Sequence, residues 1–128
     1  MSDHHDDLLR IEVERTGTTV RIAARGELDI STVDLLREHT TRQLAGDCEI
    51  VVIDLADVTF IDSSGLHAIL EAAQDDPQRL RVIPGAAASR LFGIVGVSDR
   101  LPLVADGGVG VIDDRSLRAP TRDPRGGG

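Results

Sequence analysis

The sequence predicts an α/β fold, built as one domain around a mixed, mostly parallel β-sheet with an antiparallel N-terminal hairpin and flanking helices. Three observations indicate this fold. Two segments near the start alternate apolar and polar residues across a short turn, as the strands of a hairpin do. Two later runs, at 50–55 and 80–83, are almost continuously apolar, which is typical of strands covered on both faces. Helical spacing of apolar residues separates these runs, so right-handed crossovers between parallel strands are expected.

The hairpin and the first helix follow from the change in apolar period. Thr16-Gly17 supplies the turn, and the alternating apolar residues around it are Leu9, Ile11, Val13, Val20, Ile22 and Ala24. From Ser31 the spacing becomes helical, and one face carries Val33, Leu36, Thr40 and Leu44. Ser31 is expected to cap this helix, with Asp34 three residues later, and Gly46 is expected to end it.

The second half of the chain repeats the strand and helix succession. After the 50–55 strand, which should lie in the middle of the sheet, a helical stripe contains Leu66, Ile69, Leu70 and Ala73, and Asp75-Asp76-Pro77 ends it. The 80–83 strand leads to a helix over 86–95 with Leu91, Ile94 and Val95 on one side and Gly96 as its stop. A short strand at 101–104 should complete the sheet.

Length and charge limit the classes of function. A chain of 128 residues can bury a core of its own as one domain. Its formal net charge is −8 and it contains no lysine, which argues against nucleic-acid binding and favours a protein partner with a basic face. The single cysteine, Cys48, allows no internal disulfide and is expected to be a small core residue. We expect a cytoplasmic protein, since neither a signal peptide nor a membrane-spanning run is found.

Polar ends flank the expected domain at 8–105. Residues 1–7 should form a flexible tail, in which His4 and His5 stand among aspartates but lack the fixed geometry that a metal site needs. Residues 119–128, rich in proline, glycine and arginine, are expected to be disordered. The structure of 106–118 is left open, with a short helix at 112–117 as one alternative. No metal or cofactor is expected.

The stretch IDSSGL, residues 61–66, carries the most conspicuous chemistry. It follows a central strand and precedes a helix, where ligands and reactive groups gather in parallel sheets. Read alone, the pattern favours Asp62, Ser63 or Ser64 as an ordinary N-cap. The alternative is that one serine accepts a phosphate, which the unpaired N–H groups of the first helical turn would house well.

Catalysis by this stretch is disfavoured. The flanking residues do not form G-x-S-x-G, and the nearby His67 lacks an evident acid partner in the sequence, so a nucleophilic serine is not expected. The glycine-containing loops do not match a phosphate-binding P-loop, and no lysine exists to complete one. Any phosphate must therefore come from another protein.

Three ordered motifs resemble those of the STAS domain and, within it, those of the bacterial anti-sigma factor antagonists. The motifs are RGELDISTVDLL at 25–36, VVIDLADVTFIDSSGLHAIL at 51–70 and SRLFGIVGV at 89–97, and the similarity covers roughly 8–105. The resemblance implies a regulator that is not an enzyme. When unphosphorylated, such an antagonist binds an anti-sigma factor serine kinase and frees a sigma factor, and phosphorylation by that kinase ends the complex.

The resemblance also implies roles for individual residues. The phosphate acceptor is Ser63, with Ser64 as runner-up, and the expected partner contacts are Glu27, Asp29, Asp62, Ser63, Ser64, Gly65, Leu66 and His67. His67 replaces the small residue that commonly follows the S-S-G-L unit and could alter the choice of kinase or partner. A serine phosphatase is a further implied partner, and the free protein is expected to be a monomer. The alternative function is a STAS scaffold of a larger assembly, such as a stress-sensing complex or a transporter, without release by phosphate.

Overall fold

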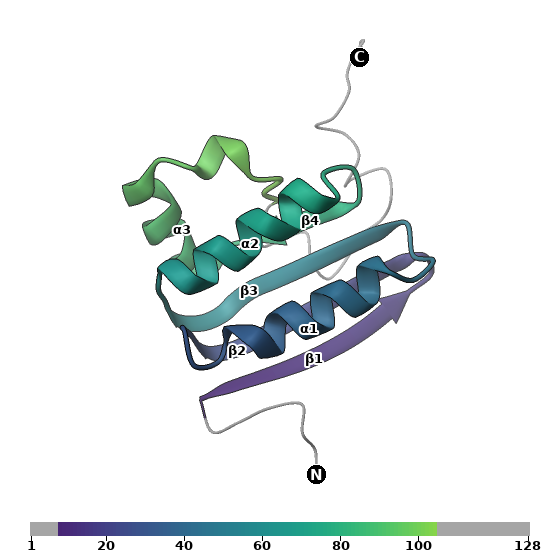
Figure 1. Cartoon of the computed structure of the whole chain (residues 1–128), viewed down its shortest axis with the longest axis horizontal. Coiled ribbons are helices and arrows are strands. Elements are labelled where there is room, and N and C mark those ends of the chain that lie inside the picture. Colours follow the sequence, from purple (N-terminus) through teal and green to yellow (C-terminus); the bar gives the residue numbers. More distant parts are fainter. Residues whose placement is uncertain (1–7, 105–128) are drawn as a thin grey trace.

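A hairpin of two strands is followed by alternating helices and strands in the computed structural model, which describes residues 8–104 (Figure 1). The hairpin comprises β1 (Leu9–Thr16) and β2 (Thr19–Leu28), and the later strands are β3 (Ile50–Ile61) and β4 (Leu80–Ile83). The helices are α1 (Val33–Leu44), α2 (Ser63–Asp75) and α3 (Gly85–Val95), followed by the short 3-10 helix η1 (Ser98–Arg100). The predictions for 1–7, 106–118 and 119–128, and for residue 105, concern positions outside the described residues.

The sheet has the predicted mixed topology. Its order is β1-β2-β3-β4, with β1 and β2 antiparallel and the other two pairs parallel. Gly17, with a positive φ of 62°, makes the hairpin turn between Thr16 and Thr19. β3 lies between β2 and β4, as its apolar run predicted. Its 12 residues extend beyond 55 to Ile61, because the pairing with β2 continues through two register shifts to Leu28↔Ile61.

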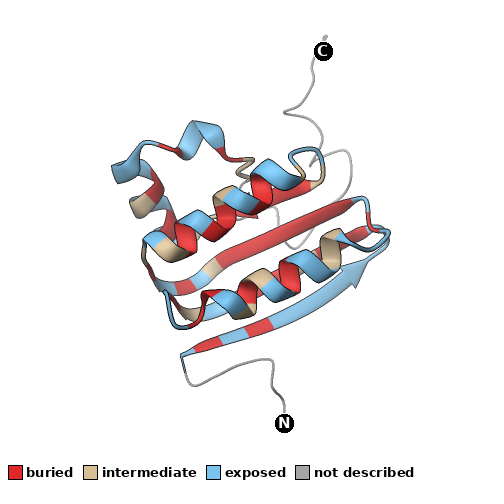
Figure 2. Cartoon of the chain, viewed as in Figure 1, coloured by how far each residue is buried: buried red, intermediate tan, exposed pale blue. Residues whose placement is uncertain are grey.

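The core lies between the sheet and the helices. α1 and α2 run side by side across one face of the sheet, and their inward sides are buried (Figures 1 and 2). The largest fully buried side chains include Ile22, Leu28, Leu36, Ile53, Leu55, Ile69 and Phe92. Burial of such side chains is the main source of stability in a domain that, over 8–104, contains no disulfide. None of the described helices combines the length and apolar character needed to cross a bilayer.

The start of α1 differs from the prediction. Ser31 is not the cap, because its hydroxyl donates to the Asp29 carboxylate at 2.7 Å, and α1 begins two residues later with Thr32 at the N-cap position. The side chain of Thr32 does not cap α1 either. Its hydroxyl donates to the carbonyl of Glu27 at 2.8 Å and accepts the amide of Asp29 at 3.0 Å, so both hydroxyls serve the turn that precedes the helix.

The last third of the chain contains two further corrections. The predicted apolar side of α3 faces the core only in part: Leu91 packs against the core, but Ile94 and Val95 are exposed, and the buried residues of the helix are Ala88 and Phe92. Both stripes have helical spacing, and burying the aromatic ring removes more apolar surface from water. The predicted strand at 101–104 is reduced to one bridge between Leu103 and Val82. Proline at position 102 contributes its carbonyl to Val82 but has no N–H to donate.

Cys48 is buried, as expected of a small core residue. Its thiol donates to the carbonyl of Gln43 at 3.4 Å. The guanidinium of Arg79 donates to the carbonyls of Cys48 and Leu44, both at 2.8 Å, and to the Asp76 carboxylate at 3.0 Å. Arg79 therefore links the carboxyl end of α1 to the turn that follows α2.

Candidate functional site

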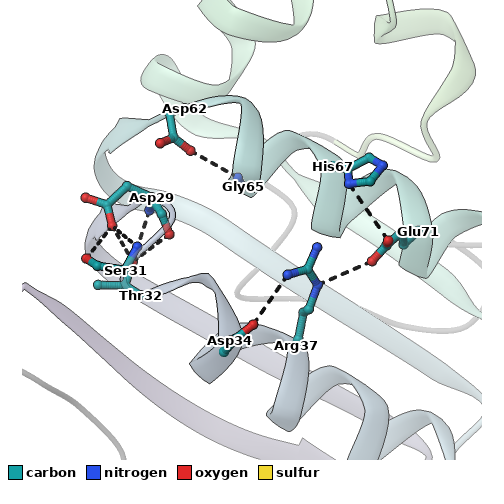
Figure 3. A network of polar contacts seen from close by, with 9 residues as sticks. All are labelled: Asp29, Ser31, Thr32, Asp34, Arg37, Asp62, Gly65, His67 and Glu71. Carbon is teal, nitrogen blue, oxygen red and sulfur yellow. Dashed lines mark hydrogen bonds and ion pairs between the residues drawn. The ribbon is translucent and has the colours of Figure 1, made fainter.

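The loops that leave β2 and β3 lie against each other. Leu28 and Ile61, the last residues of these strands, are register partners, and the amide of Asp62 donates to the carbonyl of Leu28 at 3.2 Å. The turn containing Asp29 and the start of α2 thus meet at one end of the sheet (Figure 3). Parallel pairing brings together two segments that are about 30 residues apart in the sequence.

Asp62 is the N-cap of α2. Its carboxylate accepts the amides of Ser64 at 2.8 Å and Gly65 at 3.3 Å, and its carbonyl accepts the amide of Leu66 at 3.1 Å. Ser63 is the first residue of the helix and is exposed, whereas Ser64 is partly buried. Of the three residues considered as caps, the aspartate takes that role and leaves the Ser63 side chain at the surface.

The Asp62 cap contradicts the expectation that amides of the first helical turn would bind a phosphate at the helix start. Two amides of the first turn already donate to Asp62, so they are not free to house a phosphate on Ser63. A phosphate there would instead stand next to a carboxylate. The local environment is therefore more negative than the sequence pattern suggested.

Gly65 and Leu66 are buried where α2 approaches the sheet. A β-carbon on Gly65 would lie 2.8 Å from Cγ1 of Ile61 and 2.9 Å from Cγ of Leu28. Glycine at this position lets the first turn of α2 contact the ends of both strands. The structure shows these two residues as packing elements, and their contact with a partner stays a prediction.

Asp29 is the centre of a hydrogen-bonded turn. Its carboxylate accepts the hydroxyl of Ser31 at 2.7 Å and the amide of Ser31 at 2.9 Å (Figure 3). The hydrogen bond from the Ser31 hydroxyl is the main reason why the pKa of Asp29 lies below its ordinary value, with burial opposing the shift. Asp29 therefore holds its negative charge at neutral pH beside the α2 loop, and Glu27 is partly exposed two residues earlier.

His67 belongs to a chain of polar contacts across the outer sides of α1 and α2. Its Nδ1 lies 3.8 Å from Oε2 of Glu71, one turn further along α2, so an acid partner that the sequence did not reveal exists in the fold. Arg37 of α1 contacts the other oxygen of Glu71 at 3.3 Å and also Asp34 at 3.4 Å (Figure 3). This chain of contacts joins the exposed sides of the two helices.

Two exposed apolar side chains near this end of the sheet were not predicted from the sequence as candidate partner contacts. Ile30, next to Asp29, is 76% exposed, and Phe60, two residues before Asp62, is 50% exposed. Large apolar side chains exposed near an acidic loop are candidate contacts for a protein partner. The sequence signal for Ile30 is an isoleucine inside a polar turn. The signal for Phe60 is a phenylalanine that falls outside the buried positions of β3.

A metal site does not form among residues 8–104, where no three histidine, cysteine or acidic side chains cluster suitably. His4 and His5 lie outside this part of the chain. The chemistry that the described site offers is that of hydroxyls and carboxylates at a protein surface.

A family model described as the STAS domain matches residues 10–79. This range runs from the second residue of β1 past the end of α2, and hence contains both loops of the site. Its agreement with the predicted family is independent of the structure.

Solved structures with a similar fold include proteins of known class. An anti-sigma factor antagonist from Mycobacterium paratuberculosis has 23% sequence identity, with 83% of this chain and 95% of that chain covered and a TM-score of 0.72. The anti-sigma factor antagonist SpoIIAA in its unphosphorylated form has 19% identity, 80% and 99% coverage and a TM-score of 0.59. The Bacillus cell fate determinant SpoIIAA in the phosphorylated form has 21% identity, 77% and 95% coverage and a TM-score of 0.55. These likenesses establish the fold.

Proposed function

Because the chain belongs to the STAS domain family, we propose that it is an anti-sigma factor antagonist that phosphorylation of Ser63 switches off. In its unphosphorylated form it binds an anti-sigma factor that is also a serine kinase, and a sigma factor is released. A serine phosphatase restores the active form. The protein acts in the cytoplasm as a regulator without enzymatic activity of its own, and it is a monomer when free.

The observation that carries this proposal is the exposed position of Ser63 directly after Asp62, in the loop that lies against the acidic turn of Asp29. Asp62 precedes it directly, and the turn of Asp29 lies against the same loop through the Asp62–Leu28 hydrogen bond. A kinase can reach the Ser63 side chain without unfolding the helix. The existence of SpoIIAA structures named as unphosphorylated and phosphorylated forms on this fold supports a switch of the same kind.

The charge of a phosphate explains how binding would end. Phosphoserine carries a charge of about −1.5 to −2 at neutral pH. Within an interface covering the loop, this charge would lose water and face Asp62, whose carboxylate already occupies the helix amides. Reversing a complex from mostly bound to mostly free takes ~5.5 kcal/mol, and an uncompensated buried dianion supplies an effect of that order.

The partner surface consists of the two loops and the apolar side chains beside them. Asp29 and Glu27 present negative charge, and Ile30 and Phe60 add exposed apolar area. This combination suits a partner with basic residues around an apolar patch, because charge steers the encounter and buried apolar contacts supply affinity.

A STAS scaffold in a stress-sensing complex or a transporter is the alternative. It would use the same loops for constant binding, and phosphate would not release it. The exposed serine beside the acidic cap favours the switch, since constant binding requires no modifiable hydroxyl there.

Incubation with ATP and the anti-sigma factor kinases of the same genome tests the proposal. We expect mass spectrometry to locate one phosphate on Ser63 in the wild type and in Ser64→Ala, and none in Ser63→Ala. The phosphorylated protein should bind the kinase at least a hundredfold more weakly than the unmodified one. Equal binding by both forms would favour the scaffold, and phosphate uptake that persists in Ser63→Ala but is lost in Ser64→Ala would move the acceptor to Ser64.

A further inference from the structure

His67 lies one helical turn after Ser63 on the same side of α2. Residues four apart on a helix have β-carbons about 5–6 Å from each other. Helical side chains also lean toward the N-terminus, so a histidine at position 67 can cover the turn that begins at Ser63. Both side chains are exposed. Their spacing permits direct contact once Ser63 carries a group longer than a hydroxyl.

The imidazole is free to move toward that turn. Its side chain is 69% exposed, so packing does not fix its rotamer. Its contact with Glu71 is 3.8 Å long, beyond hydrogen-bonding distance, and Glu71 also pairs with Arg37 at 3.3 Å. Moving His67 away from Glu71 therefore leaves that carboxylate paired with an arginine.

Within α2 itself, a phosphate on Ser63 would have few other partners. The amides of Ser64 and Gly65 donate to Asp62, and the nearest arginine in the network of Figure 3, Arg37, is held between Asp34 and Glu71. Within the first turns of α2, the described chain offers His67 as the side chain that can become a cation. An anion on Ser63 would attract it and favour its protonated form.

We propose that His67 is the positioning residue for the phosphoryl group on Ser63, exchanging Glu71 for the phosphate when the serine is modified. The inference rests on the proposed phosphorylation of Ser63 and adds the regulation of the modified state. The protonated imidazole donates to a phosphate oxygen and holds the group along the exposed side of α2. The phosphorylated loop then has a defined orientation.

Phosphoserine incorporated at position 63 during translation allows a test that needs no kinase. In the full-length protein, ³¹P NMR follows the second ionisation of the phosphate as the pH is varied. Asp62 is present in both wild type and His67→Gln, so the difference between their midpoints reports the imidazole. We expect the wild-type midpoint to lie lower by about 0.3 pH unit, the size of a helical pair at this spacing.

Two further measurements separate a direct contact from a general effect on the helix. The ring resonances of His67, identified by their loss in His67→Gln, should titrate at higher pH in the phosphoserine protein than in the unmodified one. Glu71→Gln should widen the midpoint difference, because its carboxylate no longer competes for the imidazole. Equal phosphate midpoints in wild type and His67→Gln, with unmoved ring resonances, would overturn the inference. If no kinase modified Ser63, the proposed function would fail while this measurement stayed valid.

Discussion

The backbone amide of Ser64 donates to the carboxylate of Asp62 at 2.8 Å, and this hydrogen bond limits which groups the start of α2 can bind. It satisfies an amide that would otherwise attract an anion. It also leaves the preceding residue, Ser63, exposed and without a capping duty. A charge added to Ser63 would consequently stand next to a carboxylate, and the two amides that Asp62 accepts would not be available to it.

Removing the cap should weaken the helix by a measurable amount. Asp62→Ala is expected to lower the free energy of unfolding by about 1 kcal/mol in a urea titration, since two amides of the first turn lose their acceptor. The matched control is Asp75→Ala at the other end of α2, where a carboxylate opposes the helix dipole. It should change stability by less than about 0.5 kcal/mol. Equal losses in both variants would show that Asp62 does not cap.

Gly65 is the second residue on which the shape of the loop depends. Gly65→Ala places a methyl group 2.8 Å from Ile61 and should cost about 1–3 kcal/mol, because the helix start must shift away from the strands. Gly93 is a helical glycine of α3 with open space around it, so Gly93→Ala should stabilise the protein by about 0.5–1 kcal/mol. Thermal or chemical unfolding of both variants checks the contrast. A harmless Gly65→Ala would mean that the close approach of α2 is not needed.

The turn of Asp29 predicts a specific pH dependence. Its pKa lies below the ordinary value of 3.8, so the carboxylate stabilises the fold fully above pH 3.8 and loses that effect as the pH falls through the folded pKa. Ser31→Ala removes the largest cause of the shift and should bring the pKa of Asp29 back toward 3.8, as NMR of the carboxyl carbon can measure. Ser89→Ala, on α3, is the control and should leave the titration unchanged. No difference between the two variants would exclude the Ser31 hydroxyl as the cause.

The sequence predicted the fold better than the details of the site. The apolar periodicity located all four strands of the described sheet, β1 to β4, because burial on one or both faces determines which positions are apolar. It did not distinguish the two possible sides of α3, where Phe92 and Ile94 belong to stripes of equal spacing. The end of β3 was also missed, since Asp57 and Thr59 interrupt the apolar run before Ile61.

The polar contacts of the site were even harder to predict from the sequence than the strands and helices. The sequence marked Asp62 as one of three possible caps, and the choice among them depends on the extended backbone at that residue. The role of Ser31 in the Asp29 turn and the contact of Arg37 with Glu71 depend on tertiary placement. Local spacing carries no information on a pair 34 residues apart.

Ile30 offers a test of the partner surface that does not involve phosphate. Ile30→Ser should weaken binding of the anti-sigma factor about tenfold or more in a calorimetric titration, if its exposed side chain fills an apolar pocket of the partner. Stability should change by less than about 0.5 kcal/mol, since little buried area is lost. Ile94→Ser, a substitution of the same type at a 77% exposed position on α3, is the control and should bind normally. An equal loss in the control would place the interface elsewhere.

Ser63→Asp separates charge from refolding as the cause of release. One carboxylate beside Asp62 mimics part of the phosphate's charge and size, so affinity for the anti-sigma factor should fall substantially, though less than after phosphorylation. Aspartate is favourable near a helix N-terminus, so the melting temperature and circular dichroism should stay close to wild type. Ser63→Ala serves as the matched variant and should bind tightly, because it removes only an exposed hydroxyl. Equally tight binding by both variants would mean that the loop lies outside the interface, and the scaffold function would then be favoured.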